Sequence, residues 1–310
     1  MNSLSVAASI ATPNPALVSD LVADLLAEEL SARQAKAAGH APGAVTSFEP
    51  LDRELGGFLA PGVHTVLAAP GAGKTALCLQ IAARCGCPVL YVSAEMRRVE
   101  LLRRLIARET GEYLGKLRGG ALDGDRLHAL ACRAAAKTPQ LALFDAQEAA
   151  GCPEGGGATV SALAARAAAL KAHFQSDHVL VVIDSVTEWA PLATMNDPSS
   201  AGVGEYALAE VAVNGLKNLA SVLRCPVLAI AHRHRAAQGK DADRLHGAKG
   251  TGRYEYISES VWDMERDQKN RPSCGESVYV DLTLLKNRYG AVGGTFRFCF
   301  EGRIQKFSLA

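Results

Sequence analysis

The sequence predicts an α/β protein with a doubly wound, mainly parallel sheet, a β-rich C-terminal edge and an N-terminal amphipathic helix. Three observations lead to this fold class. Short apolar runs alternate with longer helical patterns through most of the chain, which favours βαβ units. A glycine-rich turn separates the first apolar run from the helical pattern after it. The C-terminal part contains several strand patterns joined by tight turns.

Length and composition exclude several protein classes. The 310 residues are enough for one large α/β domain and a short appendage. No apolar run is long enough to span a membrane, and residues 1–14 lack the features of a secretory signal, so we expect a disordered leader and a cytoplasmic protein. The eight cysteines show no zinc-binding spacing, and the net charge of +1 indicates no general preference for nucleic acid.

The N-terminal segment is predicted to be a helix and linker at residues 15–44, ahead of one large domain at residues 45–310. The pattern from Pro15 to Ala38 places leucines on one helical face, and the glycines and proline of residues 39–43 end the helix. These leucines are Leu17, Leu21, Leu25, Leu26 and Leu30. The helix packs either on its own domain or on a neighbouring subunit, and the pattern does not decide between the two.

The segment from Gly62 to Leu79 has the features of a phosphate-binding loop. An apolar strand pattern leads into a glycine-rich turn, whose backbone amides can converge on phosphate oxygens, and a helical pattern follows. Lys74 is placed to reach the β- and γ-phosphates, and the Thr75 hydroxyl to bind Mg²⁺. The residues that we expect to contact the nucleotide are Pro70, Gly71, Ala72, Gly73, Lys74, Thr75 and Ala76.

One position departs from the G-x-x-x-x-G-K-[ST] motif, because Ala68 stands where the motif has its first glycine. An ordinary strand-to-helix turn that contains Gly-Lys-Thr is the alternative. The register of strand, turn and helix favours the nucleotide site.

Two acidic residues follow predicted strands. Asp184 ends the apolar run from His178, a pattern typical of a Walker B strand, and we expect it to hold Mg²⁺ opposite Thr75. Glu95 follows the strand pattern of residues 88–93 and can orient or deprotonate an attacking water. The alternatives are an isolated acid after a strand for Asp184, and for Glu95 a carboxylate at the start of the helix at residues 97–110.

The elements between these motifs continue the alternation. Helical patterns cover residues 99–110, 123–137, 159–175 and 205–223, and strand patterns cover residues 141–145 and 226–231. The polar segment at residues 194–204 is expected to be a loop at the functional end of the sheet.

The strand pattern at residues 226–231 leads into a basic segment. His232 at its tip is a candidate to contact the γ-phosphate and report its loss. A glycine-rich loop of this charge can wrap a phosphate backbone, so we favour contact with DNA or RNA; a solvated loop is the alternative. The candidate nucleic-acid residues are Arg233, Arg235, Lys240, Arg244, Lys249 and Arg253.

The C-terminal strand patterns cover residues 260–264, 278–285, 294–300 and 304–307. Lys286 and Arg288 lie between two of them, two positions apart, so their side chains project to the same side of an extended segment. The alternative is that they only keep a hairpin soluble.

Taken in order, these segments resemble a RecA-like P-loop ATPase core, in particular the ATPase domain of DnaB-type replicative helicases, with the RadA/Sms branch second. The resemblance covers about residues 45–307 and rests on residues 51–75, 91–96, 181–184, 229–235, 246–267 and 284–298. It implies ATP and Mg²⁺ as ligands, Glu95 as catalytic carboxylate, and Lys286 and Arg288 as a basic finger supplied to the neighbouring subunit. His232 departs from the glutamine usual in the DnaB group and leans toward the RadA-like branch.

The same resemblance implies a homohexameric ring that hydrolyses ATP and moves on single-stranded DNA, together with replication or recombination proteins. The N-terminal helix resembles a linker helix that docks on the adjacent protomer. A different class of function stays open: a nucleotide-dependent scaffold, loader or regulator that unwinds nothing. The low net charge and the few aromatic residues favour this second class.

Overall fold

The computed structural model describes residues 17–151, 157–195, 204–232, 256–270 and 276–310. The chain divides into two compact units, Met1–Pro42 and Gly43–Ala310. The first contains helix α1 (Val18–Ala37), which buries none of its residues. The domain boundaries at residues 14 and 44 stay a prediction. None of the helices in the described ranges has both the length and the apolar character needed to cross a membrane.

The elements of the second unit, in chain order, are α2 (Glu49–Glu54), β1 (Gly62–Ala68), α3 (Lys74–Ala82), β2 (Val89–Ser93), α4 (Arg98–Thr110), α5 (Gly124–Lys137), β3 (Leu141–Asp145), α6 (Ala146–Ala150), α7 (Val160–His173), β4 (Leu180–Asp184), α8 (Val186–Thr194), α9 (Glu205–Leu223), β5 (Pro226–His232), β6 (Ser258–Arg266), β7 (Val278–Asn287), β8 (Thr295–Glu301) and β9 (Lys306–Leu309).

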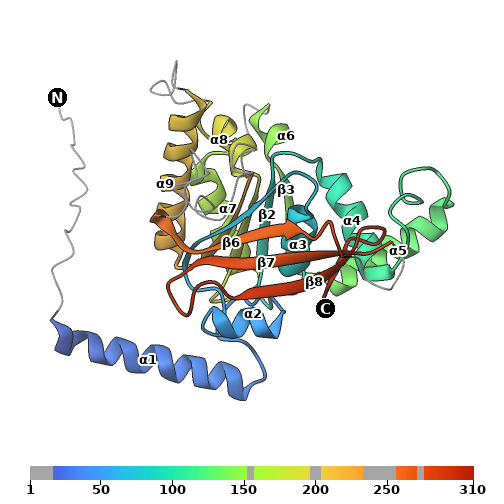
Figure 1. Ribbon diagram of the computed structural model, residues 1–310. Coiled ribbons are helices and arrows are strands. Elements are labelled where there is room, and N and C mark those ends of the chain that lie inside the picture. The colour runs from blue at the N-terminus through green and yellow to red at the C-terminus, as the bar shows by residue number, and fades with distance from the viewer. Residues whose placement is uncertain (1–16, 152–156, 196–203, 233–255, 271–275) are drawn as a thin grey trace, which may run out of the picture. The chain divides into compact units, whose positions relative to one another are not determined.

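The described strands form one nine-stranded sheet in the order β3-β2-β4-β5-β1-β6-β7-β8-β9. Strands β3 to β6 in this order are parallel, and β7, β8 and β9 continue the sheet in antiparallel pairs. Strands β6, β7 and β8 lie side by side at the C-terminal part of the sheet (Figure 1). The predicted α/β class and the β-rich edge are therefore confirmed.

Two hydrophobic cores cover the two faces of the sheet. The side chains of β4 alternate between them: Val182 lies in the core that contains α2, α3 and α4, and Val181 and Ile183 lie in the core that contains α7, α8 and α9. This division explains why β4 reads as a continuous apolar run, since a parallel strand with helices on both faces has no solvent-facing side.

Most predicted elements form within a few residues of the expected bounds, and β3 matches its prediction at both ends. The short helices α2, α6 and α8 were not predicted, because α2 and α6 have only six and five residues and α8 contains Pro191. One difference in bounds bears on the site: the strand predicted at residues 278–285 continues through Lys286, which pairs with Val261, because β6 offers a partner there. Lys286 thus lies on the strand and Arg288 directly follows it.

Strand register brings the candidate site residues to one edge of the sheet. His232 at the end of β5 pairs with Ala68 at the end of β1, and Asp184 at the end of β4 pairs with Ser93 at the end of β2. The carboxyl ends of parallel strands are where open α/β sheets bind ligands.

Candidate functional site

The phosphate-binding loop connects β1 to α3. Gly71 and Gly73 have φ angles of 77° and 99°, in the left-handed region that residues with a side chain rarely adopt. Gly73 is the N-cap of α3, and no side chain caps the first turn of this helix. The amides of that turn and the positive end of the helix dipole are therefore available to an anion.

Lys74 is buried and bends back over the loop. Its Nζ lies 3.0 Å from the carbonyl oxygen of Ala68 and 3.3 Å from that of Ala69. The same ammonium lies 3.3 Å from Nδ1 of His232. Lys74 and His232, both predicted to contact phosphate, are thus neighbours at the ends of β1 and β5.

Ala68 accounts for the departure from the glycine-rich motif. It is the last residue of β1, it is completely buried, and its φ angle is negative. A methyl group therefore costs no backbone strain at this position. The carbonyl of Ala68 still accepts from Lys74, so the loop keeps its fold without the first glycine.

Asp184 is held at the end of β4 by two hydroxyl groups. Tyr91 on β2 donates a hydrogen bond to Oδ2 over 2.7 Å, and Thr75 on α3 is also hydrogen-bonded to the carboxylate. Burial raises the pKa of Asp184 above its usual value, and the hydrogen bonds from Tyr91 and Thr75 oppose this shift. The predicted pair of Thr75 and Asp184 therefore comes together in the folded chain.

Glu95 lies beyond the end of β2 and contacts the ring of His232. Oε1 of Glu95 is 2.5 Å from Nε2 of His232. This hydrogen bond is the main cause that lowers the pKa of Glu95, with burial acting in the opposite direction. His232 therefore bridges Lys74 through Nδ1 and Glu95 through Nε2.

The chemistry of the donors suits a magnesium nucleotide. Hydroxyl and carboxylate oxygens are the ligands that Mg²⁺ prefers, and it usually takes only one or two of them from the protein. Thr75 and Asp184 supply such a pair beside the phosphate loop. Oγ of Ser185 is buried beside Asp184 and has no hydrogen-bond partner of normal geometry among the described residues. It lies close enough to Glu95 to help lower the pKa of that carboxyl. The Ser185 hydroxyl is thus available to form a hydrogen bond with a ligand or a water molecule.

Lys286 and Arg288 lie at the opposite edge of the sheet. The chain at Asn287 pairs with Ser260, which pairs with His64 near the start of β1. His64 lies four residues before Ala68, so at about 3.3 Å per residue this position is roughly 13 Å along the strand from the start of the phosphate loop. Both cations contact the carbonyl oxygen of Tyr256 at 3.4 Å, so they project to one side as predicted. Within one chain they do not meet Lys74 or Glu95.

The six candidate nucleic-acid residues Arg233, Arg235, Lys240, Arg244, Lys249 and Arg253 lie outside the described residues. Their role stays a prediction. Most of the loop predicted at residues 194–204 also lies outside the described residues, so its role stays a prediction as well.

Two site residues were missed from the sequence. Tyr91 lies in an apolar run that indicates only a strand, although a buried tyrosine needs a partner for its hydroxyl, which was a usable signal. Gln147 on α6 donates to the carbonyl oxygen of Ala94 over 2.7 Å and so supports the backbone beside Glu95. No local pattern marks Gln147, because the contact joins residues that are far apart in the chain.

A sequence-family profile matches the part of the chain that forms the sheet and its helices. The profile described as "DnaB-like helicase C terminal domain" matches residues 43–309. It thus covers β1 to β9 and every site residue described above.

Curated relatives are similar over most of this chain. The "Replicative DNA helicase DnaB" of Treponema pallidum (strain Nichols) is 27% identical over 272 residues, which are 86% of this chain and 56% of the relative. The protein of the same name from Leifsonia xyli subsp. xyli (strain CTCB07) is 27% identical over 282 residues, 87% of this chain and 56% of the relative. The chain therefore spans about half the length of these two relatives.

Two solved structures share the fold. One, described as an "ATPase Domain", superposes with a TM-score of 0.76 at 20% identity and covers 96% of this chain and 100% of that one. "The Structure Of A DnaB-Like Replicative Helicase And Its Interactions With Primase" gives a TM-score of 0.72 at 21% identity, over 95% of this chain and 67% of that one. These likenesses show a RecA-like ATPase fold.

Proposed function

The chain belongs to the DnaB-like helicase C-terminal domain family, and from this premise we propose that it is an ATP-hydrolysing motor that forms a ring and moves on single-stranded DNA. The observation that carries the proposal is the cluster of Lys74, His232 and Glu95 at the edge where the parallel strands end. His232, the candidate sensor, contacts both Lys74, which would bind phosphate, and Glu95, which would orient water.

Each residue of this edge has a defined task in the proposal. The amides of residues 70–76 and the ammonium of Lys74 bind the phosphates, and Thr75 and Asp184 hold the metal ion. Bound Mg²⁺ would neutralise charge on the phosphate oxygens. Glu95 orients the attacking water and accepts its proton. Its pKa is lowered by the hydrogen bond with His232, so the carboxylate is ionised at neutral pH and available for this task.

The basic finger acts on the neighbouring subunit. Lys286 and Arg288 lie at the sheet edge opposite the phosphate loop, so one chain does not bring them to its own nucleotide. A second copy that places this edge against the loop would complete the site. Cationic groups supplied in this way can contribute about 10³ to 10⁵ in rate. We therefore propose a homohexameric ring with ATP between subunits.

The remaining partners follow from the family. Residues 233–253 would contact single-stranded DNA from the ring, and helix α1 would dock on the adjacent protomer. The proposed setting is cytoplasmic DNA replication or recombination, together with proteins of those pathways. The solved DnaB-like helicase is described with its interactions with primase, which makes a primase one candidate partner.

The test measures ATP hydrolysis with and without single-stranded DNA at several salt concentrations, and the mass of the assembly with and without ATP. We expect hydrolysis to rise with DNA, the DNA affinity to fall steeply with salt, and the mass to correspond to a closed ring. ATP-dependent assembly without any DNA stimulation would instead support the scaffold or loader. Absence of hydrolysis in every assembly would contradict both ATPase functions.

A further inference from the structure

The C-terminal strand β9 lies against the phosphate loop, although it is the last element in the sequence. Phe307 is the one buried residue of this strand, with about 1% of its surface exposed. Its ring stacks on Phe300 at a centroid distance of 4.4 Å and meets Phe298 edge to face at 6.1 Å. Phe307 therefore belongs to a closely packed aromatic cluster.

This cluster touches the loop at Gly73. A Cβ atom built on Gly73 would lie 2.9 Å from Cζ of Phe307 and 3.5 Å from Cε1 of Phe300. The aromatic rings thus fill the space beside the backbone of the proposed phosphate-binding loop. Gly73 also has a φ of 99°, which glycine adopts without strain, so the rings and not a backbone preference limit how far this residue can move toward β9.

A second contact fixes the same strand to the loop's helix. The buried side-chain amide of Gln80 on α3 pairs with the backbone of Phe307 in both directions. Phe307 N donates to Oε1 over 2.9 Å, and Nε2 donates to the Phe307 carbonyl oxygen over 2.8 Å. The amide satisfies backbone groups that an edge strand would otherwise leave unpaired.

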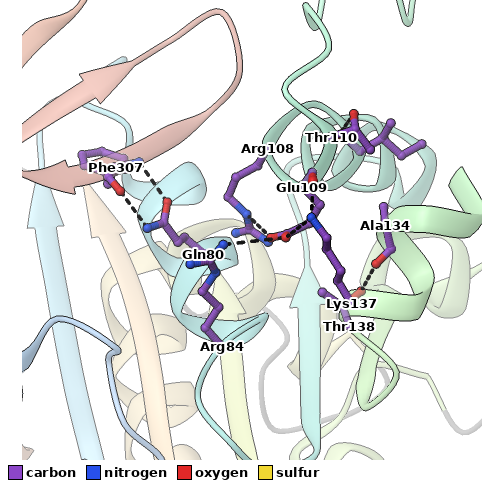
Figure 2. A network of polar contacts seen from close by, with 10 residues as sticks. Gln80, Arg84, Arg108, Glu109, Thr110, Ala134, Lys137, Thr138 and Phe307 are labelled. Carbon is purple, nitrogen blue, oxygen red and sulfur yellow. Dashed lines mark hydrogen bonds and ion pairs between the residues drawn. The ribbon is translucent and has the colours of Figure 1, made fainter. Parts of the chain in front are cut away.

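Figure 2 shows this pair together with the anchor on the other side of the helix. Arg84, just after α3, lies 3.7 Å from the carboxylate of Glu109 on α4, and Arg108 donates to that carboxylate over 2.9 Å. The C-terminal end of α3 is therefore tied to α4 through Arg84, and Gln80 ties the same helix to β9.

We propose that Phe307 and Gln80 are positioning residues that hold the phosphate loop in its nucleotide-binding shape. The inference rests on the proposed function of that loop. Phe307 packs beside Gly73, and Gln80 fixes Phe307 relative to α3. Loosening either contact lets the amides near Gly73 leave the arrangement that binds phosphate, because glycine has many accessible conformations and the rings of Phe307 and Phe300 occupy the space into which it would move.

The experiment compares Phe307→Leu and Gln80→Leu with a matched control, Phe296→Leu. Phe296 is a partly buried residue of β8 that packs on the same core but is not among the nearest neighbours of Gly73. Binding of ADP with Mg²⁺ is measured by calorimetry, thermal unfolding is measured without nucleotide, and hydrogen–deuterium exchange is followed at residues 71–77.

We expect Phe307→Leu and Gln80→Leu to weaken ADP binding about tenfold and to speed exchange at residues 71–77. Phe296→Leu should change ADP binding less than twofold, with a smaller loss of thermal stability because its ring is only partly buried; binding is therefore measured well below the unfolding temperature of every variant. Equal ADP affinity in all three variants, or equal weakening in Phe296→Leu, would overturn the inference. If the unmodified protein does not bind ADP, the proposed function fails, and the exchange rates alone decide whether the two residues hold the loop.

Discussion

The hydroxyl group of Tyr91 donates a hydrogen bond of 2.7 Å to Oδ2 of Asp184, and both side chains are buried. The bond fixes one oxygen of the carboxylate, and the Thr75 hydroxyl also interacts with this group. It also opposes the increase in the pKa of Asp184 that burial causes. A tyrosine on one strand thus prepares a candidate metal ligand on the next.

Tyr91→Phe should therefore destabilise the protein with little change in shape. Removing one partner of a buried hydrogen bond costs about 1–3 kcal/mol of unfolding free energy. The variant should also need more Mg²⁺ for half-maximal hydrolysis, because Asp184 loses its orientation. Denaturant unfolding and a Mg²⁺ titration check this. Tyr279→Phe, which removes a hydroxyl that bonds to no described residue, is the control, and an equal effect there would contradict the role.

Lys74→Ala should abolish ATP hydrolysis and leave the fold intact. Removing a preorganised charged donor commonly costs about 10² to 10³ in rate. Lys74 contacts the carbonyl oxygens of Ala68 and Ala69 and the ring of His232, all at the site itself, so the loss should not reach the hydrophobic cores. Turnover assays and circular dichroism measure the two effects. Lys306→Ala, an exposed cation on β9, should retain activity; full activity in Lys74→Ala would remove the basis of the site.

Arg288→Ala should stop turnover and leave nucleotide binding nearly unchanged, because Arg288 lies at the edge opposite the chain's own loop. Mixing it with Glu95→Gln should restore part of the activity, since some interfaces then combine an intact finger with an intact carboxylate. Hydrolysis is measured over a series of mixing ratios. Arg53→Ala, at an exposed ion pair on α2, is the control. No recovery at any ratio would argue against a site shared between subunits.

His232→Ala should lower kcat roughly 10- to 100-fold, less than the loss of a direct donor such as Lys74. The hydrogen bond from His232 is the main reason that the pKa of Glu95 is low, so its removal raises that pKa. The acid limb of the pH–rate profile should then shift to higher pH. His232→Gln, which can bridge the same two groups, should recover much of the rate. An unchanged acid limb in His232→Ala would contradict this account.

His64 should make the protein less stable below neutral pH. Its ring is buried, with Nε2 2.8 Å from the carbonyl oxygen of Ala60 and Nδ1 2.8 Å from Oγ of Ser260. The carbonyl can only accept, so Nε2 carries a proton. Burial lowers the pKa of His64 below its usual value near 6.5.

The sign of this effect follows from proton uptake. Below about pH 6.5 the unfolded chain binds a proton at His64 that the folded chain does not, so the stability present above this pH is lost as the pH falls toward the folded value. Thermal unfolding from pH 8 to pH 5 measures the loss. His64→Gln keeps a donor for Ala60 and should show a smaller decrease between pH 6.5 and 5. An equal decrease in both proteins would assign the effect to other groups.

Local sequence patterns were enough to predict the candidate nucleotide-binding residues at the carboxyl ends of the parallel strands. Lys74 and Thr75 follow a glycine-rich turn, Asp184 and His232 each end a strand, and Glu95 lies two residues after one, so these patterns were sufficient to name them. Strand register then brings these residues together as expected, because parallel strands expose their carboxyl ends at one edge. The resemblance to the DnaB type was likewise carried by short motifs in order.

The distant residues that support that edge could be identified only from the folded chain. Tyr91 meets Asp184, Gln147 meets Ala94, and Phe307 meets Gly73 across large separations in the chain. No periodicity records such contacts, since each depends on how strands and helices pack and not on the spacing of neighbouring residues. The position of Arg288 also depends on the folded chain. Because β7 runs antiparallel to β6, its last residues and Arg288 lie toward the end of the strands that is away from the phosphate loop.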